Sequence, residues 1–303
     1  MLPAQCPLCG ALPENQSVVT SHVYGAKSGD RAFFWCNSCD VRYLYPRLSA
    51  EDEQKFYRAE FEGFMNSRSG DSGGWTDGEH HVLANEATRL RRMKYLPPLS
   101  EGSRILEIGC SSGFMLYPLH ELGHCCVGVE PSGLFRAYLS DRGIKNYASL
   151  EEVPPEVSVQ GFDLIMHFFV LEHIGNALEF LQVQLRMLKR GGLLVFEVPN
   201  VSDPLASIYD VPEFERFYWS IAHPWYFSER SLSYLLEKVR QKYEIKFDQR
   251  YDLSNHMIWA RDGRPGGQGV FADMLGDELN AAYKQALIER KHCDTLIGFI
   301  QKL

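Results

Sequence analysis

Four short apolar runs, separated by stretches long enough to form helices, constrain the fold of this chain more than any other feature. They cover residues 105–108, 125–129, 164–169 and 193–198. Each run carries apolar residues on both faces of the strand that it forms, so both faces must be covered. Such strands, alternating with helices, build a parallel sheet with helices on both sides. We therefore expect a doubly wound, Rossmann-like α/β fold with a binding crevice at the carboxyl ends of its strands.

Changes in sequence pattern divide the chain into four regions. Ser49 and Asp52 resemble a capping box that opens a first helix. A Gly-, Ser- and Asp-rich stretch at 66–78 predicts a loop before a second helix at about 79–95. The expected units are a zinc-binding module at 1–47, a helical connector covering the active site at 48–98, the α/β domain at 99–262 and a C-terminal loop and helix at 263–303.

Two Cys-x-x-Cys pairs predict a structural metal site near the N-terminus. Cys6 with Cys9 and Cys36 with Cys39 would each aim two thiolates at one point, as a tetrahedral zinc site requires. Four thiolates close the coordination sphere, so the zinc should brace its segment rather than do chemistry. The alternatives are unrelated core cysteines or a redox pair, and the spacing of the pairs does not favour a disulfide framework.

Charge and hydropathy limit the partners of the chain. The formal net charge is −8, which repels a phosphate backbone, so nucleic acid is a disfavoured partner. No apolar run approaches the roughly 18 residues that cross a bilayer, and the sequence does not begin like a secretory leader. We expect a cytoplasmic protein that acts on a small molecule, with its oligomeric state left open.

The first apolar run leads directly into a glycine-containing turn. The segment 105–114 reads Ile-Leu-Glu-Ile-Gly-Cys-Ser-Ser-Gly-Phe, a strand followed by a turn and the start of a helix. The next run ends in an acid, Glu130, whose carboxylate can accept hydrogen bonds from both hydroxyls of a ribose. The Gly-x-Gly-x-x-Gly spacing of nicotinamide enzymes is missing from the turn. By itself, the turn could also be a bare nucleotide-binding turn or a purely structural Rossmann turn.

These motifs, in this order, resemble class I S-adenosylmethionine-dependent methyltransferases over about residues 100–262. The segments 161–174 and 188–195 resemble the fourth strand with its exit, and the turn and fifth strand, of the same family. Ser111 stands where the family often has a glycine. The resemblance implies that the cofactor lies against Glu107, Gly109, Cys110, Ser111, Gly113, Glu130, Pro131, Leu150, His167 and Phe168, with His167 and Phe168 beside the sulfonium.

The substrate side is expected in an aromatic segment at 214–226. A concave site lined by aromatic rings and a few polar groups suits a small organic acceptor, although a packed lid or a partner interface would have the same composition. His223-Pro-Trp-Tyr-Phe-Ser228 resembles the element that borders the acceptor pocket in the family, and Ser228 is the expected N-cap of a helix reaching Val239.

The cysteine pairs together with the segment 43–47 resemble deoxysugar C-methyltransferases and related small-molecule methyltransferases. This implies a sugar, nucleotide-sugar or other secondary or cell-envelope metabolite as acceptor. Those sugar enzymes continue into a further C-terminal α/β domain, whereas this chain has about 40 residues after the expected core, so O- or N-methylation stays open. The rival hypotheses are a zinc-ribbon RNA base methyltransferase and a non-catalytic zinc-bearing scaffold.

Methyl transfer from a sulfonium is a direct displacement, so positioning and exclusion of water provide most of the rate. A base is needed only for a hydroxyl or an acidic carbon. We expect His223 to be that base or an orienting group, with Tyr57 and Tyr226 as further orienting residues. The alternative for His223 is a hydrogen bond that fastens the loop, in which case the base is sought at Tyr57, His167 or His173.

Overall fold

The computed structural model describes all residues except 1, 28, 50, 53–55, 57–62 and 65–76. Most of the helix expected after Ser49, and residues 66–76 of the loop expected at 66–78, therefore lie outside the described residues. The capping contact itself is present, since the Oγ of Ser49 accepts a hydrogen bond of 3.1 Å from the backbone N–H of Asp52.

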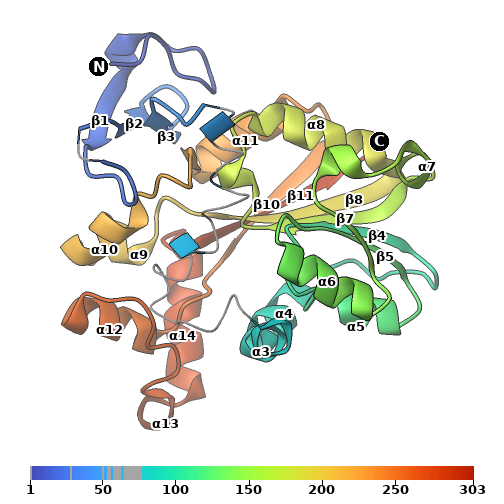
Figure 1. Cartoon of the computed structure of the whole chain (residues 1–303). Helices are drawn as coiled ribbons and strands as arrows, with labels where there is room; N and C mark the ends of the chain where they lie inside the picture. Colours follow the sequence, from blue (N-terminus) through green and yellow to red (C-terminus); the bar gives the residue numbers. More distant parts are fainter. Residues whose placement is uncertain (1, 28, 50, 53–55, 57–62, 65–76) are drawn as a thin grey trace.

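A seven-stranded sheet forms the centre of the described chain (Figure 1). Its order is β10-β11-β8-β7-β4-β5-β6, and the pairs from β8 to β6 are parallel. The four expected strands are confirmed as β4, β5, β7 and β8. The strands are β4 (Arg104–Ile108), β5 (Cys125–Val129), β6 (Lys145–Tyr147), β7 (Phe162–Phe168), β8 (Leu188–Pro199), β10 (Lys242–Asp248) and β11 (Thr295–Gln301).

The expected parallel sheet is present from β8 to β6, and the C-terminal segment, expected to form a loop and a helix, adds a further strand to it. β11 lies between β8 and β10 and is antiparallel to both of them. The C-terminal segment forms the expected helix α14 (Asp277–Glu289), preceded by α12 (Leu253–Asp262) and α13 (Ala272–Leu275), but then returns to the sheet. Six of the seven residues of β11 are buried, because a strand inserted between two others must be apolar on both faces.

Helices cover both faces of this sheet (Figure 1). Along β4, Leu106 and Ile108 face one hydrophobic cluster and Ile105 faces the other, as the alternation of strand side chains requires. The first cluster includes leucines of α8 (Ala177–Met187) and α11 (Glu229–Glu237). The second includes leucines of α5 (Leu116–Glu121) and α6 (Gly133–Asp141), with α3 (Gly78–Ala84) and α4 (Glu86–Met93) beside them.

Of two helices expected from the sequence, one is divided in the structure and the other is confirmed. The helix expected at 79–95 is divided into α3 and α4 at Asn85, whose side-chain amide donates to the carbonyl of His81 at 2.8 Å. The helix expected after Ser228 is confirmed as α11. Ser228 and Ser231 exchange side-chain and backbone hydrogen bonds there, forming a capping box.

The N-terminal module is joined to the α/β domain through a shared sheet. β1 (Gln16–Thr20), β2 (Ala32–Cys36) and β3 (Arg42–Tyr45) continue into β9 (Trp225–Tyr226), which belongs to the aromatic segment. The first part of that segment is α10 (Pro212–Tyr218) rather than a loop, and α9 (Pro204–Ser207) precedes it. The rings of Phe33, Trp219 and Tyr226 pack together with centroids 4.8–5.4 Å apart. The module therefore buttresses the segment expected to border the acceptor.

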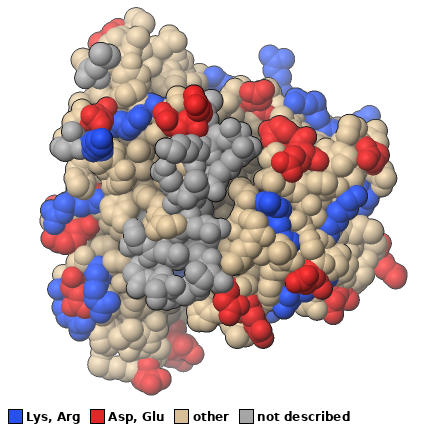
Figure 2. Space-filling view, viewed as in Figure 1, with Lys and Arg blue, Asp and Glu red and all other residues tan. Residues whose placement is uncertain are grey.

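The surface has mixed charge on the face seen in Figure 2. Basic and acidic side chains are interspersed there rather than gathered into one basic patch. None of the helices formed by the described residues is long and apolar enough to cross a membrane.

Candidate active site

A cavity of about 950 Å³ opens at the carboxyl ends of the parallel strands. Every strand of the central sheet contributes to its wall at this edge, either with its end residue or with one just beyond. These residues are Ile108, Val129, Ala148, Phe168, Pro199, Arg250 and Asp294. Ligand pockets typically measure about 300–1,000 Å³, so the cavity has room for a nucleoside cofactor together with a small second ligand.

The glycine turn after β4 requires backbone that side chains would obstruct. Gly109 and Gly113 have φ of 69° and 72°, in the left-handed region. A Cβ would lie 2.7 Å from a methyl of Val170 at the first position and 2.4 Å from a methyl of Leu139 at the second. Ser111 has a φ of 43°, so it adopts the conformation of the glycine that often stands there in the family. The expected turn is present despite this departure.

Glu130 holds the turn in place from the end of the neighbouring strand. Its two carboxylate oxygens accept hydrogen bonds from the backbone N–H groups of Ser111, at 2.7 Å, and Ser132, at 2.8 Å. Glu130 is buried and lines the cavity. Each carboxylate oxygen has two lone pairs, so a carboxylate that fixes the turn can also accept from the hydroxyls of a ribose.

The cavity wall contains six of the ten residues expected to contact the cofactor. These are Gly109, Ser111, Glu130, Pro131, Leu150 and Phe168. Cys110 and Gly113 lie beneath the turn, where the Cys110 thiol occupies the space that a Cβ on Gly128 would need. Glu107 is also buried below the turn, and burial raises its pKa well above the usual range. These three residues shape the turn from behind and are not part of the wall.

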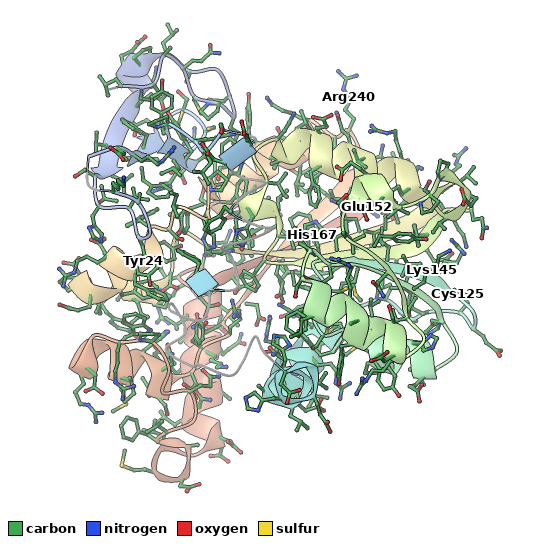
Figure 3. All side chains as sticks on the ribbon, in the orientation of Figure 1. Tyr24, Cys125, Lys145, Glu152, His167 and Arg240 are labelled. Carbon is green, nitrogen blue, oxygen red and sulfur yellow. The ribbon has the colours of Figure 1, made fainter. Side chains whose placement is uncertain are left out.

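The expectation that His167 borders the sulfonium is wrong. His167 lies inside the molecule, as labelled in Figure 3, and is fully buried. Its ring stacks on Phe196 with centroids 5.1 Å apart, on the opposite face of β7 from Phe168. Neither ring nitrogen has a hydrogen-bond partner among the described residues. Because neighbouring side chains alternate across a strand, Phe168 and His167 cannot both face the cavity.

The buried His167 should make the protein less stable in acid. Burial lowers its pKa to about 3, whereas an unfolded histidine titrates near roughly 6.5. Between these two pKa values the unfolded state binds more protons than the folded state. The free energy of unfolding should therefore decrease as the pH is lowered, by up to about 1.4 kcal/mol per pH unit. Denaturant titrations of the wild type and His167→Leu between these pH values measure the effect.

The difference between the two slopes isolates His167, because His81 and His256, whose pKa values burial lowers to about 4, remain in the variant. We expect the free energy of unfolding of the variant to fall less steeply on acidification than that of the wild type. The difference in slope should correspond to about one bound proton. Equal slopes would contradict the assignment of a neutral, buried imidazole.

The segment that was expected to border the acceptor contributes aromatic rings and one member of an ionisable cluster to the cavity wall. His223 and Tyr226 line it as expected, and the Nδ1 of His223 lies 3.1 Å from the Tyr226 hydroxyl. His173 and Glu172 line the same wall, from the short 3-10 helix η4 (Leu171–His173) that follows β7. Burial raises the pKa of Glu172 to about 8. Tyr57 lies outside the described residues.

Two cavity residues were not singled out from the sequence. Arg92 of α4 lies over the Phe168 ring at 4.2 Å and donates from Nε to Glu197 at 2.9 Å. The Nδ1 of His81, in α3, lies 2.9 Å from the Ser112 hydroxyl. Both residues are on helices that precede β4 and the glycine turn. Only their burial in the folded chain distinguishes them from surface positions of a polar helix.

The four paired cysteines converge in the N-terminal module. Their sulfurs all lie within 4.8 Å of one another, with 3.8 Å between Cys6 and Cys39 and 3.6 Å between Cys9 and Cys36. Zinc–thiolate bonds of about 2.3 Å in a tetrahedron place sulfurs about 3.8 Å apart. None of the eight cysteines forms a disulfide in the described chain. The donor set and its dimensions therefore fit a structural zinc ion.

Comparisons with known proteins agree with this geometry. A sequence family described as a methyltransferase domain matches residues 80–239, which is just over half of the chain. The chain therefore belongs to this methyltransferase domain family, and the expected class of enzyme is confirmed for the domain.

The curated relatives match only part of the chain. A ubiquinone biosynthesis O-methyltransferase of Agrobacterium fabrum is 29% identical over 99 residues, 31% of this chain and 40% of the relative. The mitochondrial protein of that name from Rattus norvegicus is 34% identical over 113 residues, 34% of this chain and 32% of the relative. The chain thus spans less than half the length of these relatives. Their names do not support the expected likeness to deoxysugar C-methyltransferases.

Two solved structures share the fold at low sequence identity. A SAM-dependent methyltransferase from Archaeoglobus fulgidus has a TM-score of 0.51 and 16% identity, and the alignment covers 80% of this chain and all of that one. A SAM-dependent methyltransferase of Thermotoga maritima, a possible histamine N-methyltransferase, has a TM-score of 0.50 and 21% identity over 82% of this chain and all of that one. The expected Rossmann-like methyltransferase fold is confirmed.

Proposed function

We propose that this chain transfers a methyl group from S-adenosylmethionine to an oxygen atom of a small-molecule acceptor. One observation carries the proposal: the glycine turn with Glu130 and the cluster of Glu172, His173 and His223 line a single cavity. A cofactor held at the first end would present its methyl group towards the second. The O-methyltransferase relatives support oxygen as the atom that is methylated.

The cofactor end of the cavity supplies the contacts that S-adenosylmethionine needs. Glu130 takes the ribose hydroxyls, while Gly109 and Ser111 let the backbone approach the ligand. Leu150 and Pro131 cover the adenine, and Phe168 lies beside the sulfonium.

The transfer itself is a displacement at the methyl carbon. The acceptor oxygen forms the new O–C bond while the C–S bond breaks, and its electron pair stays on sulfur, leaving S-adenosylhomocysteine. The hydroxyl gives its proton to His223, which lies in a cluster with Glu172 and His173. Tyr226 is a positioning residue, because its hydroxyl contacts the Nδ1 of His223. The role expected of Tyr57 stays a prediction.

The aromatic lining favours an acceptor with an apolar or planar body. Phe169, Phe214, Phe217, Tyr218 and Tyr226 form this part of the wall. A sugar or nucleotide-sugar acceptor stays a prediction from the sequence, and the aromatic wall and the names of the relatives give it less support than a phenolic or other hydroxylated ring. The expected cytoplasmic location and the oligomeric state stay open.

We also propose that Cys6, Cys9, Cys36 and Cys39 hold one structural zinc ion. The matched sulfur spacings and the buried setting of three of the four cysteines support this proposal. A closed set of four thiolates leaves no position for substrate, so this zinc would stabilise the module that pairs with β9.

Product analysis tests the proposed reaction. The full chain is incubated with S-adenosylmethionine carrying a labelled methyl group and with separate pools of phenols, sugars, nucleotide-sugars, amines and RNA. Mass spectrometry should find the label on oxygen of a small molecule. Label on RNA, with binding that weakens steeply as salt rises, would favour the RNA methyltransferase instead. Cofactor binding without transfer to any pool would favour the scaffold.

Glu130→Ala should weaken binding of S-adenosylmethionine by roughly 2 to 3 kcal/mol, because it removes charged acceptors for two hydroxyls. It also releases the N–H groups of Ser111 and Ser132. Calorimetry measures the affinity, and Glu151→Ala, at an exposed acid of the same cavity, is the matched control. Unchanged affinity in Glu130→Ala would remove this residue from the site, and tight binding of NAD would overturn the assignment of the cofactor.

A further inference from the structure

Three ionisable side chains from distant parts of the sequence meet in the cavity wall. Glu172 and His173 belong to η4, whereas His223 lies in the turn between α10 and β9. One ligand atom from each of the three lies within 4.8 Å of the others. The two imidazole rings meet edge to face, with centroids 4.5 Å apart. This spacing brings two nitrogens and a carboxylate to one point.

Hydrogen bonds at Nδ1 fix which nitrogen of each neutral ring carries the proton. The Nδ1 of His173 lies 2.8 Å from the carbonyl oxygen of Ala222, which can only accept, so this nitrogen is the donor. The Tyr226 hydroxyl donates to the carbonyl of Tyr218, so it accepts from the Nδ1 of His223. In both rings the lone pair therefore resides on Nε2. Histidines that bind metal ions are held in the same way, with the other ring nitrogen donating to a fixed partner.

Glu172 contributes a buried carboxyl group that has no hydrogen-bond partner among the described residues. Arg250 and Arg92 are near enough to influence it, but neither forms an ion pair with it in the described chain. Burying a carboxylate is unfavourable unless it is paired with a cation or coordinates a metal ion.

We propose that Glu172, His173 and His223 bind a divalent transition-metal ion, such as Zn²⁺, Mn²⁺ or Fe²⁺. Two imidazoles and one carboxylate form a set of three protein ligands, which leaves positions open for water or substrate. All three residues line the cavity, so the open positions face the acceptor. An acceptor hydroxyl bound there would lose its proton more easily, because the cation stabilises the oxyanion.

Binding of the ion does not depend on the proposed function. The assignment of the acceptor hydroxyl as a further ligand of the ion does rest on the proposed function. The site is chemically distinct from the four cysteines, because thiolates favour soft ions and Mn²⁺ favours oxygen and nitrogen ligands. With the ion bound, His223 acts on the acceptor as a ligand of the ion.

Manganese and cobalt titrations of the full chain test the site. Mn²⁺ binding is followed by electron paramagnetic resonance, and we expect one ion per chain. Co²⁺ at the cluster should give weak visible bands without the intense near-ultraviolet charge transfer of thiolate-bound cobalt. Glu172→Gln and His223→Asn should each weaken Mn²⁺ binding at least tenfold. Glu179→Gln, at another glutamate of the cavity wall, is the matched control and should bind Mn²⁺ like the wild type.

Melting temperature and S-adenosylmethionine affinity, measured for each variant, show whether it is folded. No Mn²⁺ or Co²⁺ bound outside the four cysteines, or equal binding by the wild type and folded Glu172→Gln, would overturn the metal site. Methyl transfer that persists after chelation would overturn it as the activating group while leaving the proposed function intact. Metal binding without transfer to any acceptor would instead contradict the proposed function.

Discussion

Cys36→Ser should release the zinc ion and unfold the module formed by residues 2–47. Binding free energies of structural zinc sites are about 10–16 kcal/mol, and they appear as folding free energy because no site exists in the unfolded chain. Cys36 ends β2, the middle strand between β1 and β3, so its loss reaches both of these pairings. Elemental analysis should fall from one zinc per chain to none, and hydrogen exchange should rise throughout the module.

Cys125→Ser is the matched control, because Cys125 is exposed and lies outside the cluster. It should keep the zinc and the exchange pattern of the wild type. Protein purified without chelator that contains no metal at these cysteines would contradict the zinc proposal. The variant also tests how closely the module supports the site, since β3 pairs with Trp225 and Tyr226. Exchange at 219–227 should rise with that of the module, while exchange at β4 and β5 should not.

His223→Asn should lower kcat by about 100-fold to 10,000-fold, the range over which side chains that assist proton transfer contribute. Loss of a cation from the cluster would also lower kcat, because the acceptor hydroxyl would then lose its proton less easily. The affinity for S-adenosylmethionine should stay near that of the wild type, because the glycine turn and Glu130, which are expected to hold the cofactor, belong to other elements of the cavity wall. Single-turnover kinetics and calorimetry measure the two quantities separately.

Two further variants distinguish a role in the reaction from a role in packing. Tyr226→Phe removes the hydroxyl that contacts the Nδ1 of His223 but keeps the ring, so it should lower kcat less than His223→Asn. His22→Asn, at an exposed histidine of the N-terminal module, should behave like the wild type. If His223→Asn lowers the melting temperature and leaves turnover per folded molecule intact, His223 only fastens its loop.

Local sequence was sufficient for the strands and turn that build the cofactor end. The runs that became β4, β5, β7 and β8 carry apolar residues on both faces, a pattern typical of a strand that is covered on both sides. The turn at Gly109 and Gly113 and the cap at Ser228 could be predicted for a similar reason. Each depends on the conformational needs of a few adjacent residues, which the residue types reveal directly.

Strand alternation separated His167 from Phe168, although the sequence placed both beside the cofactor. Which face of β7 points to the cavity depends on the register of the strand against its neighbours. The C-terminal segment posed a similar problem. Residues 295–301 are apolar enough for a strand, but their insertion between β8 and β10 depends on pairings with strands 50 and 100 residues earlier in the chain.

Residues close together along the chain encode the parallel core, the cofactor turn and the paired cysteines, so these features could be predicted before the fold was known. Only the tertiary structure joined Glu172 and His173 to His223, and the N-terminal module to β9. These juxtapositions bring together residues 50 to about 180 positions apart, and they follow from how helices and sheets pack around the cavity. No local pattern of residue types specifies such packing, so the cluster of Glu172, His173 and His223 became visible only in the folded chain.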